Sequence, residues 1–424
     1  MNVVVLGLWH LGCVTAACCA EHFEVVGLDF DADIIASLQT GEAPLFEPGL
    51  DDALRAGIGS SRLRFAEGVD AEALGVADVL WVCYDTPVDD HDVADVGFVS
   101  ERLARCLPAL RPGAVVLISS QVPAGTCAEL ERRHPGVAFA YSPENLRLGK
   151  ALDIFRHPER IIVGTRAPAT RAALEPLFTP FCREIIWMRT ESAEMTKHGI
   201  NAWLALSVTF ANELARLCEA VGADAREVER GLRSEPRIGQ KAYIRPGASF
   251  AGGTLARDVV ALTSLARTHD DPAALFPAIL AGNDAHKDWA WRRLETLLGS
   301  LRGATVAVLG LTYKPGTDTL RRSGAVELAA KLLGAGATVR CYDPVVRDLP
   351  PDLAGATLTA SLTDAVDDAD AAVVATEWPQ IKEADWGTLL ATMRRRLVVD
   401  ANGFLSLEAT DIEYFAVGTR SRPK

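Results

Sequence analysis

Short runs of apolar residues, many of them β-branched, recur along the chain and are mostly separated by stretches long enough to form a helix. Continuous apolar runs of this length are typical of strands that are buried on both faces of a parallel sheet. In the first half of the chain such runs lie at residues 25–28, 79–83, 115–118, 138–141 and 160–163. In the last third they lie at residues 338–342, 371–375 and 396–399.

Two segments resemble each other at the start of these regions. Residues 3–12 read VVVLGLWHLG and residues 306–316 read VAVLGLTYKPG. Each is a strand-like run that ends in a glycine turn and precedes a helix-like stretch, which is how a β-α-β unit begins. We therefore expect an α/β fold with two Rossmann-like, doubly wound parallel sheets.

Between the two regions, residues 191–221 are apolar at helical spacing and contain no proline. The apolar positions are too many for one narrow stripe, which predicts a long helix covered on several sides. They include Trp203, Leu204, Leu206, Val208, Phe210 and Leu214. We expect this long central helix to join the two sheet domains and to form a homodimer; an ordinary core helix of one domain is the alternative.

The length of 424 residues exceeds what one core normally organises, so two or three domains are expected. Nearly half of the residues are apolar, yet no uninterrupted run approaches the ~20 residues that span a bilayer. The N-terminal segment has no basic stretch before its apolar run, so no signal peptide is expected. These features favour a cytoplasmic protein without a membrane partner.

The net charge is -13, from 43 basic and 56 acidic residues, and no basic block stands out. Nucleic acid is therefore not expected as a partner, because neutralising phosphates requires clustered lysine and arginine. The nine cysteines are an odd number without a C-x-x-C pair. They indicate reduced thiols, with neither disulfides nor a structural metal site.

The first glycine turn has features of a dinucleotide-binding site. Gly7 and Gly12 follow a strand and precede small residues, and Asp29 ends the next strand. In this fingerprint the first glycine makes the turn, the helix N-terminus receives the pyrophosphate, and an acid on the ribose favours NAD over NADP. Because Trp9 replaces the second glycine, a turn that binds no nucleotide is the alternative.

Longer motifs occur along nearly the whole chain. They are EPGL at 47–50, SPENLR at 142–147, PERIIVG at 158–164, RIG at 237–239, GASFAGGTLARD at 247–258, GLTYKPGTDTLRRS at 310–323, DP at 343–344 and TEW at 376–378. Together they resemble the motifs of the UDP-glucose and GDP-mannose dehydrogenase family, the nucleotide-sugar 6-dehydrogenases. The resemblance implies an NAD-dependent oxidoreductase that acts on a nucleotide sugar.

At the cofactor end the resemblance adds positions to the glycine turn. Thr86 lies in a Thr-Pro turn similar to that of the family, and Gln121 lies in SSQVPAGT, which resembles the family's S-T-V-P-P-G-T loop. The expected NAD-binding residues are Gly7, Trp9, His10, Leu11, Gly12, Asp29, Thr86 and Gln121.

Four residues are implied for alcohol oxidation. Lys197 and Asn201 are four apart and share a face of the expected helix; the family's equivalents orient the sugar hydroxyl and stabilise oxyanion charge. Asp258 resembles an aspartate that acts through water in proton transfer, and Glu144 is the first glutamate of SPENLR. A lysine beside a carboxylate suits removal of a hydroxyl proton, although lysine and asparagine at this spacing also fit a solvated helix face.

Several residues that differ from the family's motifs lie at positions that serve its second oxidation. Thr254 takes the position of the catalytic cysteine, whose thiolate attacks the sugar aldehyde and leads to a thioester that water opens. A hydroxyl is a much weaker nucleophile than a thiol without an adjacent base. Leu148 stands where the family has a second glutamate, and Gln121 replaces a threonine. Residues 400–403, DANG, lack the arginine of the family's D-G-R-N, which leaves one diphosphate or subunit contact in doubt.

At the substrate end, Lys314 and Arg321 resemble residues at the nucleotide diphosphate, and their charges suit a pyrophosphate. Arg237 resembles an arginine that reaches a substrate bound to the neighbouring subunit. Phe250 and Gly252 belong to the glycine-rich turn and complete the expected substrate-binding set.

We expect an NAD-binding domain at residues 1–188, a helical linker and dimerisation domain at 189–300, and a nucleotide-sugar (UDP) binding domain at 301–424. The expected function is NAD-dependent alcohol oxidation of a nucleotide sugar, with a UDP-sugar as first candidate and an altered or absent second step. The alternatives are ordinary oxidation to a uronate and a catalytically inactive nucleotide-sugar binder.

Overall fold

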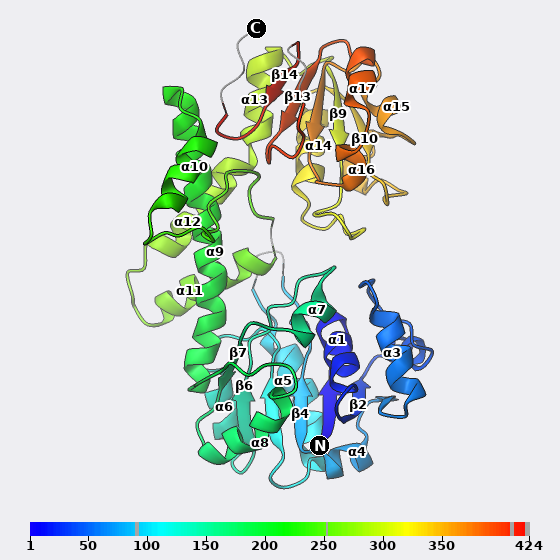
Figure 1. Ribbon diagram of the computed structural model, residues 1–424, viewed down its shortest axis with the longest axis vertical. Helices are drawn as coiled ribbons and strands as arrows, with labels where there is room; N and C mark the ends of the chain where they lie inside the picture. Colours follow the sequence, from blue (N-terminus) through cyan, green and yellow to red (C-terminus); the bar gives the residue numbers. More distant parts are fainter. Residues whose placement is uncertain (90–92, 252, 408–410, 420–424) are drawn as a thin grey trace. The chain divides into compact units, whose positions relative to one another are not determined.

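The computed structural model describes residues 1–89, 93–251, 253–407 and 411–419. The chain divides into two compact units, Met1–Ile200 and Asn201–Lys424. Each contains a parallel sheet flanked by helices (Figure 1). The expected fold class is confirmed, whereas the domain boundaries at residues 188 and 300 remain a prediction.

The sheet of the first unit has eight strands in the order β3-β2-β1-β4-β5-β6-β7-β8. Neighbouring strands are parallel except β6 and β7, which meet antiparallel at a single pair. The strands are β1 (Asn2–Leu6), β2 (Glu24–Asp29), β3 (Leu63–Glu67), β4 (Val79–Val82), β5 (Val115–Ile118), β6 (Ala138–Tyr141), β7 (Ile161–Gly164) and β8 (Ile185–Met188).

Helices cover both faces of this sheet, because alternate strand residues point to opposite sides. On β1, Val3 and Val5 enter one core, whereas Val4 and Leu6 enter the other. The helices are α1 (His10–Cys19), α2 (Ala32–Gln39), α3 (Leu50–Gly59), α4 (Ala71–Val76), α5 (Val96–Cys106), α6 (Thr126–Arg133), α7 (Ala151–Arg156) and α8 (Pro168–Phe178), with a 3-10 turn at Leu107–Ala109.

The sheet of the second unit has six parallel strands in the order β11-β10-β9-β12-β13-β14. It repeats the arrangement of the first six strands of the other sheet. The strands are β9 (Thr305–Leu309), β10 (Thr338–Tyr342), β11 (Thr357–Leu358), β12 (Ala371–Val374), β13 (Leu397–Asp400) and β14 (Glu413–Phe415). They are flanked by α13 (Trp289–Leu298), α14 (Gly324–Gly334), α15 (Leu362–Val366), α16 (Pro379–Lys382) and α17 (Trp386–Thr392), with a 3-10 turn at Pro351–Leu353.

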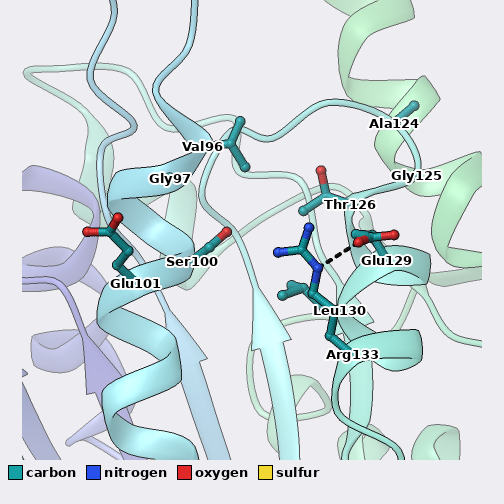
Figure 2. Close-up of a pocket in the computed structure, with 10 residues that line it drawn as sticks. All are labelled: Val96, Gly97, Ser100, Glu101, Ala124, Gly125, Thr126, Glu129, Leu130 and Arg133. Carbon is teal, nitrogen blue, oxygen red and sulfur yellow. Dashed lines mark hydrogen bonds and ion pairs between the residues drawn. The ribbon is translucent and has the colours of Figure 1, made fainter.

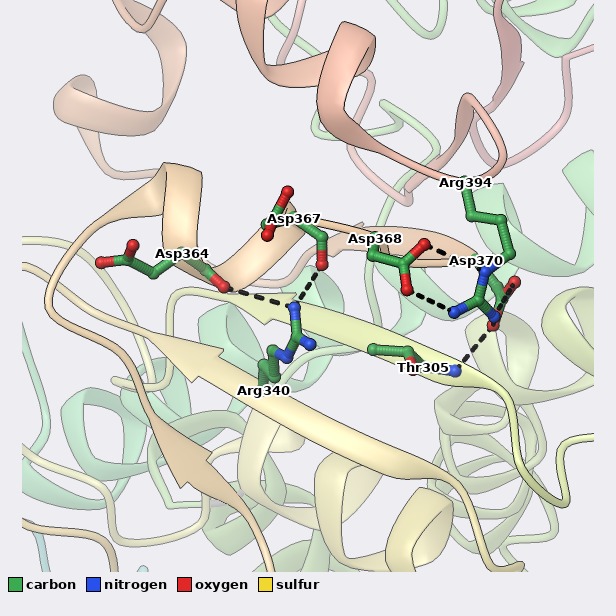
Figure 3. Close-up of polar contacts among 7 residues, drawn as sticks. All are labelled: Thr305, Arg340, Asp364, Asp367, Asp368, Asp370 and Arg394. Atoms are coloured by element: carbon green, nitrogen blue, oxygen red, sulfur yellow. Dashed lines mark hydrogen bonds and ion pairs between the residues drawn. The ribbon is translucent and has the colours of Figure 1, made fainter.

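Ion pairs tie together the amino ends of these strands (Figure 3). Asp370, just before β12, accepts from the backbone N–H of Thr305 at the start of β9 (2.8 Å). Arg394 donates to Asp370 (3.0 Å) and to Asp368 (2.7 Å). These contacts hold the edge of the sheet opposite to the one at which α/β proteins bind ligands, so we assign them to stability.

The helix α9 (Thr190–Val221) has 32 residues and contains the division between the units. In the second unit it is followed by α10 (Ala225–Ser234), α11 (Thr254–Thr268) and α12 (Leu275–Lys287). The buried positions of α9 include the small residues Ala202, Ala205, Ala211 and Ala215.

The expectation that α9 is covered on several sides is wrong for the side that carries Trp203, Phe210 and Leu217. Trp203 is 67% exposed, Phe210 49% and Leu217 64%. The other large residues of the predicted pattern, Leu204, Leu206, Val208 and Leu214, are partly buried. Alanines occupy the buried faces and let neighbouring helices approach closely. Among the described residues, no helix combines the length and apolar character needed to cross a membrane.

Candidate functional site

The turn between β1 and α1 requires glycine at two of its positions. A Cβ on Gly7, which has φ +95°, would lie 2.7 Å from the ring of Tyr84, and a Cβ on Gly12 would lie 1.7 Å from the carbonyl oxygen of Gly7. Trp9 has φ −89° and ψ −152°, an extended conformation that needs no glycine, and it is 43% exposed. The tryptophan therefore leaves the shape of the turn intact.

Asp29 lies at the end of β2, beside this turn, and is 7% exposed. One carboxylate oxygen accepts from the backbone N–H of Leu8 (2.7 Å), and the other accepts from those of Phe30 (2.7 Å) and Asp31 (3.2 Å). The carboxylate is thus held where a ribose diol is bound in such folds. Leu11 is a core residue, so only its backbone is available at the helix end. Together with the glycines, this geometry fits NAD.

His10 is the first residue of α1 and lies 3.0 Å, through Nε2, from Oε2 of Glu47. Glu47 belongs to the EPGL motif, and its side chain is 1% exposed. It also accepts from the backbone N–H groups of Gly149 (2.8 Å) and Ala151 (2.9 Å). The cofactor turn is therefore joined, through one buried carboxylate, to the segment that follows SPENLR.

Two expected cofactor residues meet at the carboxyl ends of β4 and β5. The Thr86 hydroxyl donates to the carbonyl oxygen of Gln121 (2.7 Å). This contact fixes the Thr-Pro turn against the SSQVPAGT loop at the edge of the sheet where α/β enzymes bind ligands.

Glu194 is a residue of this region that the sequence analysis missed. It is fully buried on α9, and it accepts from the backbone N–H groups of Gly125 (2.6 Å) and Cys127 (2.9 Å) at the start of α6. Burial raises the pKa of this carboxyl group, against the lowering effect of the two backbone donors. Glu194 therefore fixes the end of the SSQVPAGT loop.

A cavity of about 540 Å³ opens between the N-terminal ends of α5 and α6 (Figure 2). Its lining is Val96, Gly97, Ser100, Glu101, Ala124, Gly125, Thr126, Glu129, Leu130 and Arg133. None of the expected site residues is among them. This cavity therefore does not mark the candidate site.

In the first unit, Lys197 and Glu144 lie together. The Lys197 ammonium donates to the carbonyl oxygen of Glu144 (2.6 Å) and lies 3.5 Å from its carboxylate, which accepts from the backbone N–H of Leu146 (2.7 Å). The lysine side chain is 5% exposed. This placement excludes the solvated helix face for Lys197.

In the second unit, the Asn201 side-chain amide donates to the carboxylate of Asp258, and both residues are buried. Asp258 lies on α11, four residues after Thr254, so the two residues share one face of that helix. Thr254 is the first residue of α11 and is exposed, and Gly253 before it has φ +116°. The carboxylate is thus held one turn from the position at which the family has cysteine.

Two asparagines hold the glycine-rich loop that precedes α11. Asn212 accepts from the backbone N–H of Gly247 (2.9 Å) and donates to the carbonyl oxygen of Ala248 (3.2 Å). Asn283 accepts from the N–H and donates to the carbonyl oxygen of Phe250 (both 3.0 Å). Phe250 is thereby fixed in the loop.

His286 completes this support. Its Nδ1 accepts from Arg216 (2.9 Å), so its Nε2 carries the proton that is donated to the carbonyl oxygen of Gly247 (2.8 Å). Burial lowers the pKa of His286 to about 4, and the nearby Arg216 adds to this effect. The imidazole is therefore neutral near pH 7. Gly252 lies outside the described residues.

Cationic side chains lie in the segment between β9 and α14. Lys314 lies 5.4 Å from the ring centre of Tyr313, and Arg321 is exposed. Neither forms an ion pair within the described part of the chain. Arg237 is also exposed, at 88% of its side chain, and pairs with Glu235 (2.7 Å).

Two arginines reach the DANG segment after β13. Arg226 donates to the carbonyl oxygen of Asn402 (2.6 Å), and Arg245 donates to the same oxygen (3.1 Å). Burial lowers the pKa of Arg226, and Arg245 contributes to the same direction. Positive charge is thus present at the segment that lacks the arginine of D-G-R-N.

Comparison with known proteins covers all of these regions. Three segments of the chain match the three domains of the UDP-glucose/GDP-mannose dehydrogenase family. They are residues 1–182 for the NAD binding domain, 191–285 for the central domain and 307–406 for the UDP binding domain. The chain belongs to this family.

Individual relatives agree. A UDP-glucose 6-dehydrogenase of Pseudomonas aeruginosa is 35% identical, with 94% of this chain and 93% of the relative covered. One from Rhizobium meliloti is 32% identical over the full length of both chains. A UDP-glucose dehydrogenase structure from Pyrobaculum islandicum is 30% identical, with a TM-score of 0.86 and coverage of 99% and 98%.

Membership confirms an NAD-dependent nucleotide-sugar dehydrogenase with an NAD binding domain. The UDP binding domain supports a nucleotide-sugar substrate.

Proposed function

We propose that this protein oxidises an alcohol of a UDP-sugar with NAD, and that its second oxidation step is altered. The observation that carries the proposal is the pairing of Asn201 with Asp258 on the helix that begins with Thr254. Asn201 and Asp258, which suit proton transfer, are retained. Thr254, one helical turn from Asp258, replaces the family's nucleophile.

The chain's own residues supply positioning and charge. NAD, when bound, accepts the hydride; Gly7, Gly12 and Asp29 would hold it, with Trp9, His10, Leu11, Thr86 and Gln121 around it. Lys197 is anchored by Glu144 and has further N–H donors for the substrate oxygen. Asn201 orients Asp258, which would accept the hydroxyl proton through water. These groups supply the positioning and the proton transfer that a first oxidation requires.

The second oxidation is altered because Thr254 carries a hydroxyl. Its side chain is exposed, and it makes no hydrogen bond to a base within the described residues. An unactivated hydroxyl stays protonated near pH 7 and attacks an aldehyde poorly compared with a thiolate. It could still stabilise an aldehyde hydrate, so a slow second step without a thioester is compatible with the site.

The test is to incubate the protein with NAD and a panel of UDP-, GDP- and dTDP-sugars, and to measure NADH formed per sugar consumed. We expect a ratio near one, and no covalent adduct in the intact-protein mass during turnover. A ratio of two with a uronate product would restore the ordinary reaction. Nucleotide-sugar binding without NADH formation would indicate an inactive binder.

At the substrate end, we propose that Lys314 and Arg321 bind the nucleotide diphosphate. Both are cations without a carboxylate partner within the described residues, at the ligand-binding edge of the second sheet. Arg226 and Arg245 add positive charge near Asn402, where D-G-R-N would have placed it. Phe250 would line the sugar side.

We also propose a homodimer through α9. Trp203, Phe210 and Leu217 are exposed and lie seven residues apart, so they form one apolar stripe along the helix. The Arg237 side chain is exposed and pairs within the chain with Glu235; the family resemblance implies that it reaches a second copy. The proposed domains are 1–188, 189–300 and 301–424.

A further inference from the structure

His10 lies at the N-terminus of α1, the helix end that receives the pyrophosphate in dinucleotide-binding folds. It is the first residue of the helix, its side chain is 13% exposed, and Nε2 lies 3.0 Å from the Glu47 carboxylate. Because an ionised carboxylate only accepts, Nε2 must carry a proton. The other nitrogen, Nδ1, has a lone pair in neutral histidine and an N–H in protonated histidine. It has no hydrogen-bond partner within the described chain.

The start of α1 lies among acidic groups. Burial raises the pKa of the Cys13 thiol, three residues along the helix, and Asp29, Asp85 and Asp51 raise it further. A diphosphate bound here would add negative charge to the same region. Neutral histidine would present a lone pair to it, whereas protonated histidine would present a donor and a positive charge.

The other charged groups on the elements packed against α1 have partners elsewhere or lie outside hydrogen-bond distance of His10. On α3, Arg55 pairs with Asp51 and Asp52. On and beside α7, Arg156 pairs with Glu21, Asp153 pairs with His157, and Lys150 is exposed. Within the described residues, Glu47 is thus the charged group in direct contact with His10.

Trp9 removes one feature of the dinucleotide fingerprint, which a contact from His10 would offset. The second glycine of the fingerprint lets the backbone approach the pyrophosphate closely, and a side chain at this position prevents that approach. We propose that His10 takes up a proton when the cofactor binds, and that its Nδ1–H then donates to the diphosphate while Nε2–H stays on Glu47. Cofactor affinity is therefore linked to pH. This inference rests on the NAD-binding role of the domain.

The experiment is calorimetric titration of the full-length protein with NADH from pH 6 to 8.5, in pairs of buffers with different ionisation enthalpies. We expect proton uptake on binding, and an affinity that falls as the pH rises because the bound form carries the extra proton. In His10→Gln, which keeps a donor for Glu47 but cannot titrate, both effects should disappear.

His157→Gln is the matched control, because His157 also pairs with a carboxylate, Asp153 (3.3 Å), but is 75% exposed on α7. It should behave as the wild-type protein. Binding without proton uptake, or pH dependence that persists in His10→Gln, would overturn the inference and leave the proposed function standing. Absence of any NADH binding would overturn both.

Discussion

At the scale of single residues, position 254 decides how far the reaction proceeds. Replacing Thr254 with cysteine should raise the NADH formed per sugar from near one toward two, because a thiol restores a nucleophile that is partly ionised near neutral pH. The measurement is NADH yield against sugar consumed, with intact-protein mass recorded during turnover to detect the thioester.

Thr254→Ser is the control for this variant, since it matches cysteine in shape and keeps a hydroxyl. Its ratio should remain near one. If Thr254→Cys also stays near one, the altered step must be assigned to Gln121 or Leu148 instead of to the nucleophile.

Arg321 gives a second prediction at this scale. Arg321→Ala should weaken UDP binding by roughly 1 to 3 kcal/mol, the usual effect of losing a charged hydrogen-bond donor. Calorimetry with UDP measures it. Arg302→Ala removes an equally exposed arginine at the opposite end of β9 and should leave affinity unchanged. Equal affinities in the two variants would count against the diphosphate assignment.

Sequence patterns predicted individual residues unevenly. Gly7, Gly12 and Asp29 were found because a tight turn and a strand end have strict requirements. Trp9 has an extended backbone and is 43% exposed, neither of which the sequence reveals. Glu194 was missed because its partners on α6 are 67 and 69 positions away in the chain. Its charge within an apolar helical pattern was the available signal.

At the scale of elements, the loop that precedes α11 depends on contacts from α9 and α12. Asn283→Ala removes both hydrogen bonds to the backbone of Phe250. We expect KM for the nucleotide sugar to rise roughly tenfold, because the loss of such bonds typically costs about 1 to 3 kcal/mol. NADH affinity should not change, since the NAD-binding turn lies in the other unit. Equal weakening of both ligands would indicate general unfolding.

His286, which supports the same loop, makes the free energy of unfolding sensitive to acid. The pKa of His286 is lowered to about 4 from an ordinary value of 6.5, so the unfolded chain binds its proton first as the pH falls. The contribution of neutral His286 to the free energy of unfolding is fully present above pH 6.5. It is lost as the pH falls toward 4, and the total loss is about 3 kcal/mol. Denaturant unfolding of the wild-type protein and of His286→Gln at pH 7 and at pH 4.5 measures this change in the free energy of unfolding.

The variant should lose less stability than the wild-type protein over this range, because glutamine can accept from Arg216 and donate to Gly247 without titrating. His269→Gln, an exposed histidine at the end of α11, should follow the wild type. Parallel pH curves for all three proteins would refute the link between His286 and acid sensitivity.

At the scale of the whole molecule, the two sheets share a strand order and similar aspartate contacts at the amino ends of their strands. Asp78 accepts from the backbone N–H of Asn2 (2.8 Å), as Asp370 does from Thr305 (2.8 Å), and each aspartate also pairs with an arginine. Sequence patterns predicted the apolar central strands. They missed the edge strands β3, β8, β11 and β14. Polar residues alternate along β3, and β11 and β14 are short, whereas β8 is an apolar run like those of the central strands.

The exposed stripe on α9 gives the last prediction. Phe210→Glu places a charge in the middle of the proposed dimer contact, where burial without a partner is unfavourable. We expect dimerisation to weaken by about 2 kcal/mol or more, roughly 30-fold, measured by sedimentation across a range of concentrations. Val76→Glu, at an exposed valine on α4, is the control and should remain dimeric.

If Arg237 acts on a neighbour's substrate, the Phe210→Glu monomer should bind NADH normally but lose turnover. A monomer with full activity would show that Arg237 serves no neighbouring site, and a wild-type monomer would remove the dimer altogether.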